Sequence, residues 1–393
     1  LSENLSEFPS EIFELADSLE VLDLSDNQLH ELPQDLNRLH QLKILFCSNN
    51  QFTCLPDMLS LCPKLEMIGF KSNQITEVPA SSLPLKTRWL ILTDNRISQL
   101  PEKLGELKQL EKLMLSGNEL IQLPHSLHQC HNLGLVRLSA NQLSQFPDFL
   151  LDLPKLAWLA FSGNPFCQDS KSSGQIQILN ADIFSLKEIL GQGASGVISR
   201  ALVLDDSLTL PHEVAVKVFK GEVTSDGYPE DELDACLSTG EHPNLVKPLA
   251  QIKDANFSAL VMALIPAHYT NLGQAPSLAS CTRDTFTQGQ SFNIDEISKI
   301  VEQMESLVHH FTQKCVSHGD LYAHNVLIDR QCHILFGDFG AASKYENLAN
   351  YQQSGIQAIE KRAFNYFVED MLSLCPEEDK ASPKFQHLRQ SLT

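Results

Sequence analysis

An asparagine recurs at a nearly fixed interval through the first 164 residues of the chain. The interval is always 22 or 23 residues, and the positions are Asn27, Asn50, Asn73, Asn95, Asn118, Asn141 and Asn164. Prolines keep the same step, at Pro33, Pro56, Pro79, Pro101, Pro124 and Pro147. A fixed period of this length is typical of a solenoid, in which each repeat buries its apolar face only by stacking on its neighbours. We therefore expect residues 1–167 to form one stacked array.

Apolar residues keep the same register as the asparagines. Leu22, Leu24 and Leu29 around Asn27 belong to the pattern LxxLxLxxNxLxxLP, which resembles the leucine-rich repeat. The resemblance implies a short strand in each repeat, with its leucines pointing inward. The asparagine side chains then hydrogen-bond the backbone where the chain turns away from each strand, as a ladder that satisfies otherwise buried polar groups. Cys47 takes the place of Leu24 in the next repeat, so we expect a buried thiol there.

Strand positions between the inward leucines face the concave side of such a solenoid. Large apolar residues at these positions form what we call the concave strip: Phe46, Trp89, Ile91, Met114 and Trp158. Apolar patches on an exposed sheet usually bind something, and solenoids use their concave surfaces for binding. The alternative is that these side chains only pack flat on neighbouring strands. We favour a protein partner on the concave strip.

A glycine-rich segment marks the second half of the chain. Leu190 to Val197 reads LGQGASGV and lies between apolar stretches. A GxGxxG motif alone could also be a dinucleotide-binding turn, which should open a helix and meet an acidic residue about 20 residues later. Instead Val214 to Val218 (VAVKV) follows, a β-branched strand that carries Lys217. This combination resembles the N-terminal lobe of a protein kinase.

The kinase resemblance implies a set of ATP-binding residues. They are Gly191, Gly193, Gly196, Val197, Ala215, Lys217, Glu232, Met262 and Leu327. The glycines would let backbone N–H groups approach the phosphates, and Lys217 would pair with the α- and β-phosphates. Met262 aligns with the gatekeeper, Ala263 to Ile265 with the hinge, and Leu327 with the residue beneath the adenine.

The same pattern requires a helix glutamate that holds Lys217 in place. Candidates lie in the acidic stretch just before His242, where we favour Glu232, with Glu230 and Asp234 as alternatives. Acidic residues in a first helical turn also suit the helix dipole. The choice among the three therefore stays open at this point.

Two further motifs carry the chemistry. His318 to Leu327 reads HGDLYAHNVL, and Gly337 to Gly340 reads GDFG. In this order they resemble the catalytic and metal-binding loops of protein kinases. The resemblance implies that Asp320 is the catalytic base that accepts the hydroxyl proton, and that Asn325 and Asp338 bind Mg²⁺. Apolar periodicity predicts buried helices before and after these motifs, at 294–314 and 359–374.

The second half also departs from the kinase pattern. Gly319 replaces the arginine that usually precedes the catalytic aspartate, so activation through a phosphorylated loop is not expected. Tyr322 stands where Ser/Thr kinases usually place a phosphate-contacting lysine. No Ala-Pro-Glu motif follows Gly340, which makes a peptide substrate less certain. The HGDLxxxN form also resembles small-molecule kinases of the aminoglycoside and choline type, although these generally lack the Asp-Phe-Gly loop.

Composition excludes several other classes of protein. The net charge of −20 argues against an extended nucleic-acid-binding surface. There is no run of 18 apolar residues, so no membrane span is expected. Ten cysteines show no CxxC spacing, and several occupy apolar positions of the repeats. This usage favours reduced, buried thiols and a cytoplasmic protein.

We therefore predict an α/β leucine-rich-repeat solenoid at 1–167, a linker at 168–184 and an α+β, two-lobed protein-kinase-like domain at 185–393. The N-lobe would span 185–265 and a shortened C-lobe 266–393. The whole resembles soluble leucine-rich-repeat protein kinases of the bacterial type. The expected activity is ATP- and Mg-dependent transfer to protein Ser/Thr hydroxyls. The alternatives are a nucleotide-binding pseudokinase scaffold and a small-molecule kinase.

Overall fold

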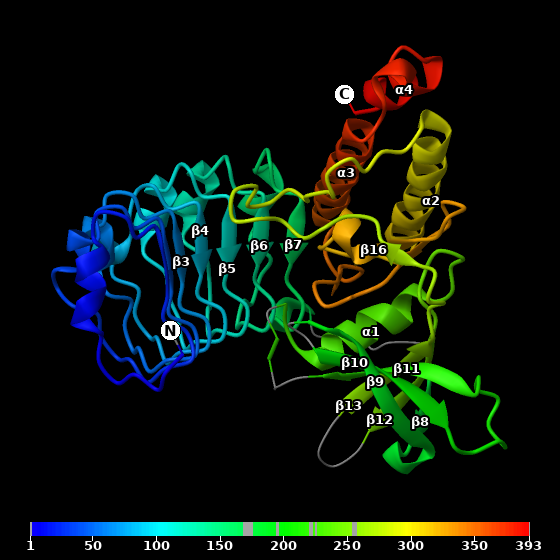
Figure 1. The fold of residues 1–393 in the computed structure, drawn as a ribbon, viewed down its shortest axis with the longest axis horizontal. Helices are drawn as coiled ribbons and strands as arrows, with labels where there is room; N and C mark the ends of the chain where they lie inside the picture. Colours follow the sequence, from blue (N-terminus) through cyan, green and yellow to red (C-terminus); the bar gives the residue numbers. More distant parts are fainter. Residues whose placement is uncertain are drawn as a thin grey trace. The chain divides into compact units, whose positions relative to one another are not determined.

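A computed structural model describes residues 2–167, 176–193, 196–219, 223–224, 226–253 and 258–392. The chain divides into two compact units, and each is considered by itself (Figure 1). The first contains residues 1–168 and 225–227, and the second contains 169–224 and 228–393. Ala194 and Ser195 of the glycine-rich motif, and residues 168–175 of the predicted linker, lie outside the described residues.

Strands of the first unit form a seven-stranded parallel sheet over the described residues, and each strand pairs with the next in sequence. Their bounds are β1 (Val21–Asp23), β2 (Ile44–Phe46), β3 (Met67–Gly69), β4 (Trp89–Ile91), β5 (Lys112–Met114), β6 (Leu135–Arg137) and β7 (Trp158–Ala160). The register places equivalent repeat positions side by side, as in Leu22 beside Leu45. The parallel stack confirms the predicted solenoid.

Short 3-10 helices lie in the segments before, between and after the strands of the first unit. They are η1 (Ser10–Leu15), η2 (Leu36–Arg38), η3 (Asp57–Leu61), η4 (Ala80–Ser82), η5 (Glu102–Glu106), η6 (His125–Gln129), η7 (Asp148–Asp152) and η8 (Pro165–Cys167). Several follow the periodic prolines directly, as η3 follows Pro56 and η5 follows Pro101. Proline suits these starts because it fixes φ without requiring a backbone donor.

The asparagine ladder is present inside the array. The amide of Asn118 donates to the carbonyl oxygens of Leu92 and Leu115, both at 2.9 Å. Its carbonyl oxygen accepts from the backbone N–H of Ile97 at 3.1 Å. Each such asparagine therefore satisfies buried backbone groups of its own repeat and of the preceding one, which is why the period tolerates so little variation. Cys47 is fully buried, as predicted for its leucine position.

The concave strip is only partly as predicted. Phe46 packs edge-on against Trp89 with ring centroids 6.3 Å apart, and Lys112 Nζ lies 4.5 Å from the centre of a Trp89 ring. Phe46, Trp89, Ile91 and Met114 are half-buried. Trp158 in β7 is only 2% exposed. Its expected place on an exposed strip is therefore wrong, because tertiary packing covers a position that the repeat pattern leaves open.

Two residues distant in sequence complete the first unit near its last strands. Nε of the buried Arg137 donates to Oδ1 of Asp226 at 2.8 Å. The neighbouring Gly227 has φ +138°, and a Cβ at this position would lie 2.7 Å from Cβ of Ser139. Only glycine fits this close approach. Asp226 and Gly227 thus contact the first unit at Arg137 and Ser139.

The second unit begins with a six-stranded sheet whose spatial order is β8-β12-β13-β11-β10-β9. The bounds are β8 (Gln177–Leu179), β9 (Phe184–Gln192), β10 (Gly196–Val203), β11 (Glu213–Phe219), β12 (Pro248–Lys253) and β13 (Ser258–Ala263). Neighbours are antiparallel except β8 and β12. The structure places β8 inside the segment that the sequence predicts as a linker, because Leu179 is buried in the sheet's core.

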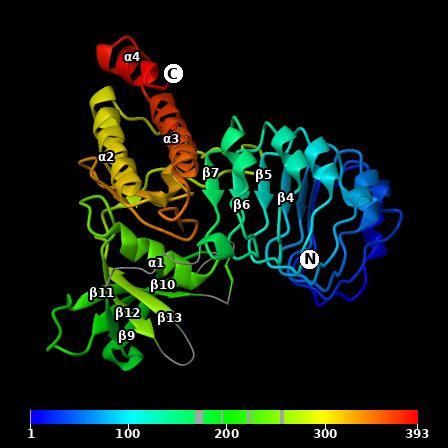
Figure 2. The same ribbon diagram turned by 180° about the vertical axis from the view of Figure 1, so that it is seen from behind.

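Helices dominate the rest of the second unit. The α-helices are α1 (Pro229–Thr239), α2 (Ile294–Gln313), α3 (Asn350–Ser373) and α4 (Pro383–Gln390). Figure 2 shows α2 and α3 side by side, and the two helices contact each other. Short strands and 3-10 turns lie between the helices: β14 (Thr270–Asn271), β15 (Val316–Ser317), η10 (Ala323–Asn325), β16 (Val326–Ile328), β17 (Ile334–Phe336), β18 (Ser343–Lys344) and η11 (Glu377–Asp379). The 3-10 turn η9 (Ala181–Ile183) lies between β8 and β9.

Local sequence explains where the two long helices begin. The side chain of Asn293 accepts from the backbone N–H groups of Asp295 and Glu296, and Glu296 reaches back to the N–H of Asn293. This capping box starts α2 where the apolar period predicts it. Helix α3 starts at Asn350, nine residues before the predicted Ile359. Its first two turns are largely polar, so apolar periodicity does not reveal them.

Candidate active site

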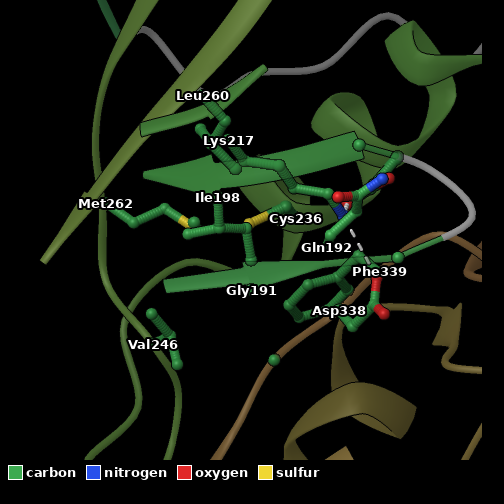
Figure 3. A pocket seen from close by; sticks show the side chains of 14 residues that line it. Gly191, Gln192, Ile198, Lys217, Cys236, Val246, Leu260, Met262, Asp338 and Phe339 are labelled. Atoms are coloured by element: carbon green, nitrogen blue, oxygen red, sulfur yellow. Dashed lines mark hydrogen bonds and ion pairs between the residues drawn. The ribbon is translucent and has the colours of Figure 1, made fainter. Parts of the chain in front are cut away.

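A cavity of about 260 Å³ lies in the second unit (Figure 3). Its walls come from β9, β10, β11, α1 and β13 and from the GDFG segment. Seven residues predicted from the sequence line it: Gly191, Gly193, Gly196, Lys217, Glu232, Met262 and Asp338. Ile198, Cys236, Val246, Leu260 and Phe339 also line it, so the cavity is mainly apolar with a few charged groups at one end. Its volume is near the lower end for small-molecule sites.

Three predicted nucleotide contacts do not line this cavity. Ile198 lines it in place of the predicted Val197, because consecutive side chains of a strand point to opposite faces. Ala215 is buried in β11, where it pairs with Met262 of β13 on the same face of the sheet, but it is covered and does not line the cavity. Leu327 is half-buried in β16, where it pairs with Leu335.

The glycines of the motif have different structural reasons. A Cβ at Gly196 would lie 2.5 Å from the carbonyl oxygen of Val218, so packing alone requires glycine there. A Cβ at Gly191 or Gly193 would meet nothing within 4 Å. The absence of side chains at these two positions instead leaves the hairpin backbone open to the cavity.

Lys217 is the centre of charge in the cavity. It is buried in β11, and its Nζ pairs with Oε1 of Glu232 and lies 3.2 Å from Oδ1 of Asp338. Burial opposes the charge, but Asp338 and Glu232 outweigh it and raise the pKa of Lys217 above its ordinary value. Of the three acidic candidates on α1, Glu232 therefore is the partner of Lys217.

Asp338 is held in a conformation that few non-glycine residues adopt. Its φ is +55°, in the left-handed region that costs an ordinary residue free energy. Burial opposes ionisation of its carboxyl group, but Lys217 outweighs this effect and lowers the pKa. More than half of the side-chain surface is still exposed. Asp338 thus presents an ionised carboxylate that other groups can reach.

An aromatic cluster fixes the segment that carries Asp338. Phe339 is 4% exposed and packs edge-on against Phe311 of α2, with centroids 6.0 Å apart. The ring of His318 lies 5.2 Å from Phe339 and 4.3 Å from Phe336, and its Nε2 is 3.1 Å from the carbonyl oxygen of Gly337. These contacts tie the catalytic-loop motif to the GDFG motif.

Asp320 and Asn325 are joined directly. Nδ2 of Asn325 donates to Oδ2 of Asp320 at 2.8 Å and to its carbonyl oxygen at 3.0 Å. Asn325 ends η10, a single 3-10 turn that brings the two residues together across four intervening positions. The carboxylate of Asp320 therefore has a fixed orientation.

Glu360 is a site residue that the sequence reasoning missed. It lies inside α3 and is buried, where it accepts from Oγ of Ser317 at 2.6 Å and from the backbone N–H groups of His318 at 3.1 Å and Gly319 at 3.4 Å. Burial raises the pKa of its carboxyl group despite these donors. A signal was present, since Glu360 interrupts an apolar face formed by Ile356, Ala363 and Phe367. The residue anchors the backbone that leads into Asp320.

A second missed pair joins a residue of the catalytic-loop motif to a residue earlier in the chain. Nδ1 of His324 is 2.6 Å from Oδ1 of Asp284, and the backbone N–H of His324 donates to Oδ2 of Asp284 at 3.2 Å. The carboxylate of Asp284 is fully buried. It orients the His324 ring and helps to fix η10.

The side chains of Asp338 and Asn325 can supply only part of a coordination shell for Mg²⁺. Asp338 and Asn325, the two residues expected to bind the ion, offer a carboxylate and an amide oxygen. Among the described residues no three His, Cys, Asp or Glu side chains gather as a metal site. Mg²⁺ commonly takes one or two protein oxygens and completes its shell with water and substrate phosphates. The arrangement therefore fits a magnesium–nucleotide complex better than a metal held by protein alone.

Comparison with known families agrees with both halves of the fold. Residues 184–358 match the protein kinase domain, and residues 2–76 and 86–143 match the leucine rich repeat. The chain thus joins leucine-rich repeats to a protein kinase domain. None of the described helices is both long and apolar enough to span a bilayer.

Individual relatives are distant. The chain is 25% identical over 169 residues to cyclin-dependent kinase 11.1 of Caenorhabditis elegans, which covers 42% of this chain and 22% of that protein. It is 26% identical over 187 residues to serine/threonine-protein kinase AtPK2/AtPK19 of Arabidopsis thaliana, at 47% and 37% coverage. It is 22% identical over 201 residues to tyrosine-protein kinase receptor TYRO3 of Danio rerio, at 49% and 22% coverage. The chain therefore spans well under two thirds of the length of these relatives.

A solved structure of a leucine-rich-repeat protein from Leptospira interrogans is also similar to part of the chain. The identity is 24% and the TM-score is 0.36. The match covers 41% of this chain and 47% of that one.

Proposed function

We propose that this chain transfers the γ-phosphoryl group of ATP to Ser or Thr hydroxyls of proteins. The observation that carries the proposal is the pairing of Lys217 with both Glu232 and Asp338 at the wall of the cavity. Structural packing alone gives no reason to bury a lysine between two carboxylates, since buried charges are costly unless they are paired. A nucleotide phosphate is the ligand that such a lysine suits.

The other residues have separate roles in this proposal. The backbone at Gly191 and Gly193 approaches the phosphates, and Ile198, Leu260 and Met262 provide apolar walls for the base. Asp338 and Asn325 would hold Mg²⁺, which supplies charge neutralisation on the transferring phosphate. Positioning and electrostatics account for most of the rate in phosphoryl transfer.

Asp320 would accept the proton of the acceptor hydroxyl. Its carboxylate is oriented by Asn325 and its backbone is reached through Glu360. A general base must be held within hydrogen-bonding reach of the hydroxyl, and this double support provides a fixed position. Tyr322, which replaces the lysine usual in Ser/Thr kinases, is buried and adds no charge to the site.

We further propose that the repeats bind a protein partner on the concave side. The candidate contacts are the half-buried residues Phe46, Trp89, Ile91 and Met114. Trp158 is removed from that set.

The cysteines of the repeats bear on the location of the protein. Cys47, Cys62 and Cys130 are buried, and burial raises the pKa of the Cys62 and Cys130 thiols to about 11. Such unreactive thiols suit a reducing compartment, and the cytoplasm is the proposed location.

A small-molecule kinase is the second candidate. The observation that favours it is the short segment between GDFG and α3, which comprises only residues 341–349. This length leaves little chain to support an extended peptide. The two candidates differ in the acceptor and share the nucleotide chemistry.

A phosphate-transfer assay with radiolabelled ATP and Mg²⁺ tests the proposal. Wild type should label a generic protein acceptor, with phosphoserine or phosphothreonine in the product, whereas Asp320→Asn should not. Glu302→Gln provides a matched control, because it removes an exposed carboxylate of α2. Transfer to small hydroxyl compounds alone would favour the second candidate. ATP–Mg binding without transfer by wild type would overturn both and leave a pseudokinase scaffold.

A further inference from the structure

Helix α1 carries an unusual concentration of negative charge. Glu230, Asp231, Glu232 and Asp234 lie in its first six residues, and the helix contains no basic residue. Two effects raise the pKa of Asp231 to about 6. Burial is the larger effect, and repulsion by the nearby carboxylates of Asp234 and Glu230 adds to it. The position of α1 therefore depends on cations supplied by other elements. Lys217 supplies one of them, at Glu232.

Lys344 supplies a second cation, at Asp234. Its Nζ lies 3.1 Å from Oδ2 of Asp234 and 3.5 Å from Oε1 of Glu346, and its side chain is only 10% exposed. The partner Asp234 is 31% exposed. A pair with this degree of burial is screened less than a surface ion pair. It connects α1 to the segment that follows the GDFG motif.

The backbone of Lys344 is itself fixed beside the catalytic loop. Strand β18 pairs with β15, so that Lys344 lies opposite Val316 and Ser343 opposite Ser317. The N–H of Tyr345 donates to the carbonyl oxygen of Cys315 at 2.9 Å. Lys344 thus projects from a strand that is paired with β15, and Val316 of β15 lies four residues before Asp320.

Asp234 and Glu232 share one short, rigid helix. A shift or rotation of α1 that separates Asp234 from Lys344 also moves Glu232 relative to Lys217. The two ion pairs therefore act on the same element from different sides. Both charges of the Lys344–Asp234 pair are present in the unmodified chain.

We infer that Lys344 is a positioning residue for phosphoryl transfer: its ion pair with Asp234 holds α1 where Glu232 engages Lys217. The inference rests on the proposed kinase activity. It names a residue that acts through α1 and touches neither nucleotide nor acceptor. It also means that an ion pair from the segment after GDFG holds the site together, and that this segment does not have to be phosphorylated for the purpose.

The test uses the full chain with the variants Lys344→Met, Asp234→Asn and the double variant. Misplacement of a catalytic group by about 1 Å can lower a rate 100-fold. We expect each single variant to lower the rate of phosphate transfer by about 10- to 100-fold. The double variant should be no slower than either single one, because one interaction is lost in all three. Lys344→Arg should keep most of the activity.

Glu346→Gln is the matched control. It removes the second carboxylate near Lys344, one that lies outside α1, and should leave the transfer rate within about twofold of wild type. Hydrogen exchange of the α1 amides gives a readout independent of catalysis. Lys344→Met and Asp234→Asn should speed this exchange, and Glu346→Gln should not.

Two results would overturn the inference. One is α1 exchange in Lys344→Met that matches the Glu346→Gln control. The other is an additive rate loss in the double variant, which would show that the two residues act separately. If wild type transfers no phosphate, the proposed function fails, while the exchange measurement still decides whether Lys344 positions α1.

Discussion

Nζ of Lys217 lies 3.2 Å from Oδ1 of Asp338, although 121 positions separate the two residues in the chain. Lys217 comes from the middle of a strand, and Asp338 comes from a loop residue with positive φ. A third residue, Glu232, reaches the same ammonium group from α1. Three separate elements of the second unit thus meet at one buried cation. The geometry of the cavity depends on this junction.

The first prediction separates the role of Lys217 in stability from its role in catalysis. Lys217→Met should lower phosphate transfer at least about 100-fold, as the loss of a preorganised charge contact does. It should also lower the free energy of unfolding by about 3 kcal/mol, because Glu232 is left buried without its cation. The measurements are the transfer assay and denaturant unfolding followed by helical circular dichroism.

A double variant provides the control for this prediction. Lys217→Met with Glu232→Gln replaces both charges and should recover most of the lost stability, while transfer stays absent. Lys187→Ala, at an exposed lysine of β9, should change neither quantity. Recovery of activity in the double variant would contradict the proposed role of Lys217.

The second prediction concerns Glu360. Glu360→Gln replaces one carboxylate oxygen with an NH2 group, which cannot accept a hydrogen bond. The variant therefore loses either the bond from His318 or the bonds from Ser317 and Gly319. We expect kcat to fall by about 10-fold with the KM for ATP unchanged, since the cavity beside Lys217 that we propose for the nucleotide contains none of these residues. Steady-state kinetics check this split. Glu305→Gln, at an exposed position of α2, is the control, and a raised KM with normal kcat would argue against an anchoring role.

Features with a repeated or strictly ordered pattern could be predicted from the sequence. The columns around Asn118 predict strand, turn and ladder because every repeat imposes the same packing constraint on the same position. The motifs around Lys217, Asp320 and Asp338 can be identified because they share residue types and order with the motifs of protein kinases. The structure then brings Lys217, Glu232 and Asp338 together at one cavity.

Features that depend on register or on distant packing could not be predicted in this way. Val197 and Ile198 differ by one strand position, and that single step decides which side chain faces the cavity. The role of Glu360 could not be predicted, because the sequence does not show which face of α3 packs against the catalytic loop. Trp158 occupies a nominally open repeat position, and its burial results from contacts that the repeat pattern does not encode.

The third prediction tests the asparagine ladder. Asn118→Ala removes a side chain that satisfies Leu92, Leu115 and Ile97, so it should destabilise the repeats by about 2 to 4 kcal/mol. Both tryptophans of the chain, Trp89 and Trp158, lie in the first unit, so tryptophan fluorescence reports its unfolding specifically.

The half-buried Asn132 provides the comparison for the ladder. Its amide nitrogen donates to the carbonyl oxygen of Lys108 and its amide oxygen accepts from Nζ of Lys155, and both hydrogen bonds are exposed. Asn132→Ala should change stability by no more than about 0.5 kcal/mol. Equal losses in the two variants would show that burial of the ladder is not the source of its stability.

The fourth prediction is a pH dependence that originates at Asp231. Burial raises the pKa of this carboxyl group from 3.8 to about 6, and no described residue hydrogen-bonds its Oδ2. A raised carboxyl pKa in the folded state means that ionisation opposes folding. The favourable contribution of the protonated form is complete below pH 3.8 and is lost as the pH rises through about 6.

Asp231→Asn should therefore stabilise the second unit at pH 7.5 and have little effect at pH 4. The expected gain is about 1 to 2 kcal/mol, which allows for the partial exposure of the side chain. Unfolding followed by helical circular dichroism at both pH values measures it, because α1, α2 and α3 all lie in this unit. Asp206→Asn removes an exposed carboxylate and should give the same small change at both. A gain for Asp231→Asn that is equal at pH 4 and pH 7.5 would show that ionisation of Asp231 is not its cause, since burial and the neighbouring Asp234 and Glu230 disfavour only the ionised carboxylate.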